Sequence, residues 1–75
     1  MKNIDYNKYI WKGWTVQDFI EALEDDISYI MADTSIIPPF KNKDELKKYC
    51  MENQPYYKRY IPEVIEHFAN KYNIK

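Results

Sequence analysis

The spacing of apolar residues between Val16 and Met31 constrains the fold of this chain more than any other feature. Apolar side chains recur there at alternating intervals of four and three residues, at Val16, Ile20, Leu23, Ile27 and Ile30. This spacing places them on one side of an α-helix, and Phe19 and Met31 widen the same stripe. The sequence therefore predicts an amphipathic helix in this segment.

A capping pattern marks where this helix begins. The Thr15 hydroxyl can accept a hydrogen bond from a backbone N–H of the first turn, and Asp18 follows three residues later, in the position of a capping-box acid. We predict that the helix begins at Val16 and ends near Ala32.

Prolines divide the rest of the chain. Pro38 and Pro39 have no N–H donor, which predicts a loop over residues 33–41. We expect the apolar residues of this loop to fold back over the core, namely Ile36, Ile37 and Phe40.

Two further helices are predicted after this loop. Asn42 can cap a helix over residues 43–52, which has two acids in its first turn. Pro62 suits the first position of a last helix, over residues 62–72.

Pro55 and Asn73 complete this interpretation of the second half of the chain. Pro55 is placed to begin a separate helical turn that leads through Tyr60, and Asn73 lies at the end of the last helix, where we expect fraying.

The N-terminal residues are too large and apolar for a free tail: Tyr6, Tyr9, Ile10, Trp11 and Trp14. Gly13 breaks any helix before Thr15, and no strand partner is apparent. We expect this stretch to pack across the helices as an irregular arm or a short turn.

The predicted fold class is all-α: a small three-helix domain with an aromatic N-terminal arm. One domain would cover residues 1–75, with the arm at 1–14 and the helical core at 15–75, since a 75-residue chain buries only about 60% of its surface and forms a single core. The predicted core residues are Val16, Phe19, Ile20, Leu23, Ile27, Ile30, Phe40, Leu46, Tyr49, Ile61, Ile65 and Phe68.

The composition limits the location and chemistry of the protein. The N-terminus lacks the apolar run of a signal peptide and no stretch approaches about 20 apolar residues, so we expect a cytoplasmic protein without membrane contact. Cys50 is the only cysteine, which excludes an internal disulfide and any multi-cysteine metal site. No motif indicates a cofactor or a metal.

Catalysis would have to use His67 or Cys50. His67 shares a helix surface with Glu63 and Lys71 at four residues on either side, which is typical of a solvated histidine. Cys50 shares a face with apolar residues, which favours a core thiol over a nucleophile. We therefore expect a protein that is not an enzyme and has no catalytic residues.

Charge is partitioned along the sequence. Residues 13–40 hold six acids and no lysine or arginine, whereas both flanks are net basic. On the predicted helix Asp18, Glu21 and Asp25 form an acidic face that repeats about once per turn, a spacing comparable with that of phosphates. Such a face could imitate nucleic acid and occupy a basic channel on another protein, or it could be an ordinary solvated face.

A second pattern interleaves aromatic and basic residues in Tyr56-Tyr57-Lys58-Arg59-Tyr60. Exposed rings with nearby cations are typical of proteins that bind single-stranded nucleic acid. Residues for that function would be Lys43, Lys47, Tyr57, Lys58 and Arg59. The net charge of −1 opposes phosphate binding, and the tyrosines could simply close a small core.

The segments Asn53–Val64 and Trp11–Ile20 resemble small accessory proteins of phages and mobile elements of low-GC Gram-positive bacteria. The resemblance covers most of the chain in style and length. It implies binding to host or element-encoded machinery, including nucleic-acid enzymes and defence systems.

The functional hypothesis is a non-enzymatic interaction protein that binds and modulates or inhibits a protein partner. The candidate partner-binding anchors are Trp11, Trp14, Tyr56, Tyr57 and Arg59, because large aromatic residues and arginine dominate interface hot spots. Single-stranded nucleic-acid binding is the alternative. Spare aromatic surface also makes a homodimer possible.

Overall fold

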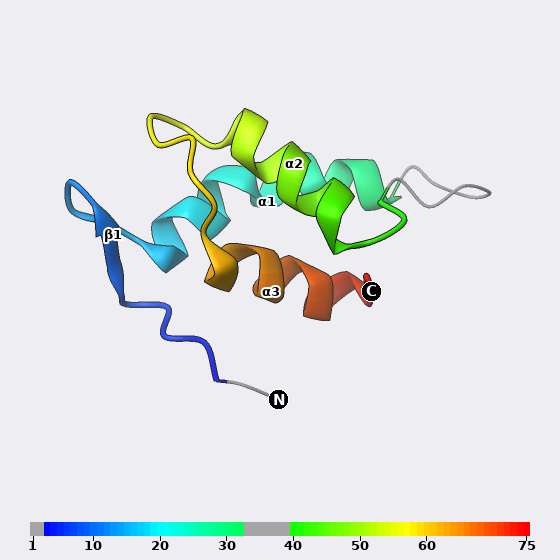
Figure 1. Cartoon of the computed structure of the whole chain (residues 1–75), viewed down its shortest axis with the longest axis horizontal. Coiled ribbons are helices and arrows are strands. Elements are labelled where there is room, and N and C mark those ends of the chain that lie inside the picture. The colour runs from blue at the N-terminus through cyan, green and yellow to red at the C-terminus, as the bar shows by residue number, and fades with distance from the viewer. Residues whose placement is uncertain (1–2, 33–39) are drawn as a thin grey trace.

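The computed structural model describes residues 3–32 and 40–75, which form a short antiparallel hairpin followed by three helices (Figure 1). The elements are β1 (Tyr9–Trp11), β2 (Trp14–Thr15), α1 (Val16–Ala32), α2 (Lys43–Asn53) and α3 (Pro62–Tyr72). The prediction of a small, mainly helical domain is confirmed, and α3 packs against both α1 and α2. The strict all-α class is wrong, because part of the expected arm is a β-hairpin.

The hairpin depends on a two-residue turn. Lys12 and Gly13 both have positive φ, 46° and 81°, which is the backbone of the tight turn that matches the twist of two antiparallel strands. Trp11 pairs with Trp14 across this turn, and an irregularity between Tyr9 and Trp11 shifts the register. No strand partner is apparent in the sequence, but the structure has one directly after the turn.

The start of α1 is capped in the predicted way. The Thr15 backbone N–H donates to Asp18 Oδ2 over 2.8 Å, and the Asp18 N–H donates to Thr15 Oγ1 over 3.3 Å. Two more N–H groups of the first helical turn, those of Val16 and Gln17, donate to the carbonyls of Lys8 and Tyr6, each over 3.0 Å. These carbonyls belong to the part of the predicted arm that precedes the hairpin, residues 3–8, and from here on the arm means this segment. The arm therefore supplies part of the helix cap.

The arm also crosses α3, as expected. Lys8 Nζ forms an ion pair with Glu63 Oε2 at 2.8 Å, and the Tyr6 hydroxyl lies 3.1 Å from Nδ1 of His67. Ile4 packs against the core from the same side. Three contacts thus fasten an irregular segment to the last helix.

The boundaries of α2 and α3 follow their caps. Asn42 Oδ1 accepts from the Glu45 N–H over 3.1 Å, and α3 begins at Pro62, so both predicted starts are confirmed. The predicted helical turn after Pro55 is wrong: residues 54–60 form a loop in which Tyr56 has a φ of 63°. A left-handed residue at this position ends any helical continuation.

The end of α3 is ordered by a left-handed cap. Asn73 has φ 57° and ψ 43°, and the Ile74 N–H donates to the Ala69 carbonyl over 2.8 Å. This geometry turns the Ile74 side chain onto the core, where it is buried. The expected frayed end is therefore wrong.

The core lies between the three helices. Of the predicted core residues ten are buried, while Ile30 and Tyr49 are partly buried against them. The core also includes Val64, Ala69 and Ile74, which the sequence analysis missed. The predicted loop over 33–41 falls mostly outside the described residues, as do Ile36 and Ile37, whereas Phe40 is buried.

Candidate protein-binding surface

Four of the five predicted anchors meet in one group of rings, here called the aromatic cluster. Its members are Trp11, Trp14, Phe19, Tyr56 and Tyr57. Trp11 stacks on Tyr57 with ring centroids 5.5 Å apart, and Trp14 lies 5.0 Å from Phe19 and 5.9 Å from Tyr56. The hairpin and the 54–60 loop, distant in sequence, therefore lie side by side at one end of the molecule (Figure 1).

The rings of the aromatic cluster differ in exposure. Phe19 is buried, Trp11, Trp14 and Tyr57 are half-buried, and Tyr56 is 76% exposed. The half-buried Trp14 packs against Tyr56, and most of the Tyr56 side chain remains accessible to a partner. Arg59 is exposed on the same loop.

The 54–60 loop is held by two polar side chains. Gln54 is 1% exposed, and its Nε2 donates to the Arg59 carbonyl over 2.5 Å. Lys58 Nζ donates to the carbonyls of Glu52 and Gln54 over 3.0 and 3.1 Å, which satisfies acceptors at the end of α2. Gln54 was not among the predicted site residues, because a glutamine beside a helix-ending proline is only a weak signal for burial.

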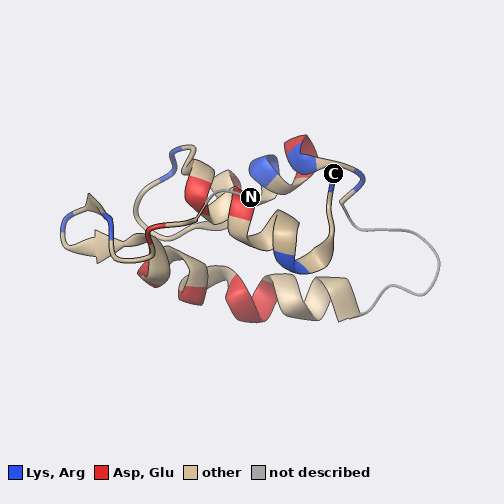
Figure 2. Ribbon diagram, turned by 90° about the horizontal axis from the view of Figure 1, so that it is seen from below, with Lys and Arg blue, Asp and Glu red and all other residues tan. Residues whose placement is uncertain are grey.

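The acids of α1 have different surroundings. Figure 2 shows α1 with acidic positions and no basic ones. Glu24 forms an ion pair with Lys71 of α3, and Asp18 serves the helix cap. Glu21 and Asp25 are exposed, so the predicted acidic face consists of two solvent-facing carboxylates and one capping carboxylate.

A hollow of about 610 Å³ joins the aromatic cluster to this acidic face. It lies between the hairpin turn and the first two turns of α1. Its lining residues are Lys12, Gly13, Trp14, Asp18, Glu21 and Ala22. Two sets of residues that the sequence analysis treated as separate surfaces thus share one concave site.

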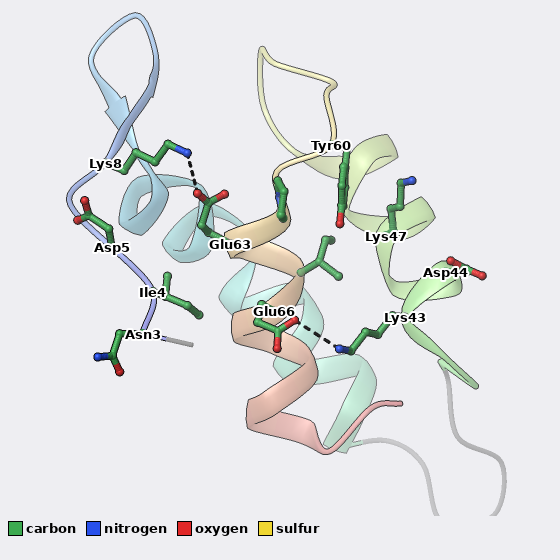
Figure 3. Close-up of a pocket in the computed structure, with 12 residues that line it drawn as sticks. Asn3, Ile4, Asp5, Lys8, Lys43, Asp44, Lys47, Tyr60, Glu63 and Glu66 are labelled. Carbon is green, nitrogen blue, oxygen red and sulfur yellow. Dashed lines mark hydrogen bonds and ion pairs between the residues drawn. The ribbon is translucent and has the colours of Figure 1, made fainter. Parts of the chain in front are cut away.

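A larger open groove of about 850 Å³ runs between the arm, α3 and α2 (Figure 3). Lys8 reaches Glu63 from the arm, and Lys43 reaches Glu66 from α2 over 3.3 Å. Two of the lysines that line the groove are therefore already paired with acids of its lining, and a third, Lys47, lies against the ring of Tyr60.

Most residues of the nucleic-acid alternative have contacts within the protein. Lys43 is paired with Glu66, Lys47 Nζ lies 4.3 Å from the centre of the Tyr60 ring, and Lys58 binds helix carbonyls. Tyr57 stacks on Trp11, and its ring lies 6.0 Å from that of Phe19 at an angle of 47°. Lys43 and Lys47 line the groove of about 850 Å³ together with Tyr60, whereas Tyr57, Lys58 and Arg59 are not among its lining residues.

The side chains with possible catalytic chemistry lie apart from this surface. Cys50 is buried, and its burial raises the pKa of the thiol to about 12, so the prediction of a core thiol is confirmed. His67 is half-buried, with Nδ1 at 3.1 Å from the Tyr6 hydroxyl, so the predicted surface histidine is only partly solvated. Desolvation by burial lowers the pKa of His67, and Lys71 adds to that effect while Glu24 opposes it.

Within 3–32 and 40–75, no group of three His, Cys, Asp or Glu side chains is arranged to hold a metal ion. In the same ranges no helix has the length and apolar character needed to cross a membrane.

Comparisons of the chain with protein-family models, with curated proteins and with solved structures give no match.

Proposed function

We propose that this protein is a non-enzymatic binding protein that attaches to a partner protein through the aromatic cluster and modulates or inhibits that partner. Its resemblance to accessory proteins of phages and mobile elements supports a nucleic-acid-processing or host-defence factor as the partner, in the cytoplasm of a bacterial host.

One observation carries the proposal: four anchors chosen from two separate segments pack into one cluster with an exposed tyrosine at its outer side. Tyrosine and tryptophan supply large contact areas with few rotatable bonds, so they lose little entropy on binding. Gln54 and Lys58 fix the loop that carries Tyr56, which reduces the ordering cost of binding further.

The test compares two equally exposed tyrosines. Tyr56 and Tyr29 are 76% and 74% exposed, but of these two only Tyr56 is a member of the aromatic cluster. Tagged wild-type protein, Tyr56→Ala and Tyr29→Ala are used to capture partners from a host lysate, with circular dichroism of each variant as the folding control. We expect one partner captured at a fixed stoichiometry by wild type and Tyr29→Ala, and at least tenfold less by Tyr56→Ala, because a hot-spot residue contributes about 2 kcal/mol or more.

Equal capture by the two variants would remove the aromatic cluster from the interface. Sedimentation velocity of the same three proteins tests whether the chain pairs with itself. A homodimer that Tyr56→Ala separates would identify the partner as a second copy.

Single-stranded nucleic-acid binding is less well supported, because Lys43, Lys47 and Lys58 have contacts within the protein. Its proposed residues would be tested by fluorescence anisotropy with a labelled oligonucleotide at low salt. Salt-dependent binding that Arg59→Ala weakens would favour this alternative over protein binding.

A further inference from the structure

The hollow between the hairpin turn and α1 has the features of a pocket for one basic side chain. We infer that it receives an arginine of the partner protein, so that the partner presents a basic segment beside the surface that contacts Tyr56. This inference deepens the proposed function, on which it rests, by naming the chemistry of the partner.

The aromatic wall of the hollow is the first argument. Trp14 lines it and is held in place by Phe19 and Tyr56, with ring centroids 5.0 and 5.9 Å away. A guanidinium stacks on a tryptophan ring with a favourable cation–π energy, and it is more weakly hydrated than an ammonium group. A fixed indole at the wall therefore favours arginine over lysine.

The carboxylates of the hollow are the second argument. Glu21 is exposed at the rim, and a planar guanidinium can bond to both of its oxygens at once. Asp18 also lines the hollow, but it already accepts from the backbone N–H and the hydroxyl of Thr15. Asp18 is thus a fixed negative charge, while Glu21 is able to form the new pair.

The shape of the hollow is the third argument. Gly13 and Ala22 are the smallest residues of its lining, and a Cβ added at Gly13 would meet no atom within 4 Å. The hollow is therefore open at Gly13, and the small, exposed Ala22 lines its side on α1.

The one basic residue at the rim is held elsewhere. Lys12 Nζ lies over the Trp11 ring, 4.9 Å from its centre. The electrostatic potential along α1 is also negative, since this helix contains five acids and no lysine or arginine. An incoming arginine would meet carboxylates on α1 and an aromatic ring on the hairpin.

The experiment is a titration of ¹⁵N-labelled protein with N-acetyl-arginine methylamide, followed by NMR. We expect saturable shifts of the Trp14 indole N–H and the Glu21 amide. The neutral isostere N-acetyl-citrulline methylamide should produce no saturable shift, and the lysine analogue should bind more weakly.

Four variants distinguish binding in the hollow from non-specific electrostatic attraction to the acidic helix. Glu21→Gln should weaken arginine binding about three- to fivefold, while Asp25→Asn, the same charge change one turn along α1, should change it less than twofold. Ala22→Leu should block the hollow without changing charge, and Ser28→Leu is its control at an exposed position outside the lining.

No shift of the Trp14 indole, equal binding of citrulline, or equal losses in Glu21→Gln and Asp25→Asn would each overturn the inference. The titration contains no partner protein. A failed pocket is therefore distinguishable from a failed proposed function, which depends on Tyr56 in the capture experiment.

Discussion

Gln54 shows how a single buried side chain decides the shape of the binding surface. Its amide bonds to the Arg59 carbonyl five residues later, so the chain between them closes into a loop. That loop places Tyr56 in the left-handed region and turns Tyr57 onto Trp11. A helical turn after Pro55 would have left a buried amide without its partner, and such a loss costs about 1–3 kcal/mol.

His67 gives the folded protein a dependence on pH. Burial lowers the pKa of His67, and the charged groups facing it are Glu24 from α1 and Lys71 from its own helix, with the Tyr6 hydroxyl contributed by the arm. The folded state therefore takes up the proton at a lower pH than the unfolded state. The stability due to neutral His67 is complete above the ordinary histidine pKa of about 6.5 and is lost as the pH falls below it.

We expect urea unfolding of the wild type to show lower stability at pH 5.5 than at pH 7.5, and His67→Gln to show a smaller difference. Glu63, whose pKa is lowered mainly by the hydrogen bond from Lys8, loses its contribution only below about pH 4.5. The two effects are thus separated in pH. An unchanged difference in His67→Gln would assign the pH dependence to other groups.

At the scale of elements, the helices were predictable and the hairpin was not. The apolar spacing from Val16 onward, the Thr15 cap and Pro62 fixed the helix starts, because these signals act through local backbone chemistry. The hairpin has strands of three and two residues, too short for an alternating pattern. Its turn is Lys12-Gly13, where the common signal would be Asn-Gly or Asp-Gly.

The turn of the hairpin requires a positive φ at Gly13. Its φ of 81° suits glycine, whereas an alanine there would strain the backbone although its Cβ would meet no neighbouring atom. We expect Gly13→Ala to lower the free energy of unfolding by about 1–2 kcal/mol, measured by urea titration.

Lys12→Asn is the matched variant of the preceding residue. Asparagine tolerates the positive φ of 46° better than lysine, so this variant should be as stable as the wild type or more stable. A stable Gly13→Ala protein would show that the hairpin adopts another turn in solution.

At the scale of the whole molecule, the sequence identified the rings of the binding surface but not their neighbours. Trp11, Trp14, Tyr56 and Tyr57 could be selected from the sequence because large aromatic residues dominate interface hot spots. The stacking of Trp11 on Tyr57 joins segments far apart in the chain, and the hollow beside Trp14 forms only when the hairpin meets α1. Neither relation has a local pattern from which it could be inferred.

The arm should contribute strongly to global stability. Removal of residues 1–8 takes away the carbonyls that cap α1, worth about 1 kcal/mol, and the packing of Ile4, worth about 1 kcal/mol or more. We expect a fall in melting temperature of roughly 8–16 °C by circular dichroism. The exposed substitution Asn7→Ala, in the same segment, should change stability by less than about 0.5 kcal/mol.

The fastening of the arm to α3 affects how the chain folds during synthesis. Translation proceeds from the N-terminus, so Tyr6 and Lys8 leave the ribosome well before His67 and Glu63. Until the last helix emerges, Tyr6 and Lys8 have their backbone bonds to the start of α1, but their side chains lack the partners on α3. Completion of the native structure therefore waits for nearly the full polypeptide, and a nascent chain stalled before Pro62 will expose the apolar side of α1 to chaperones.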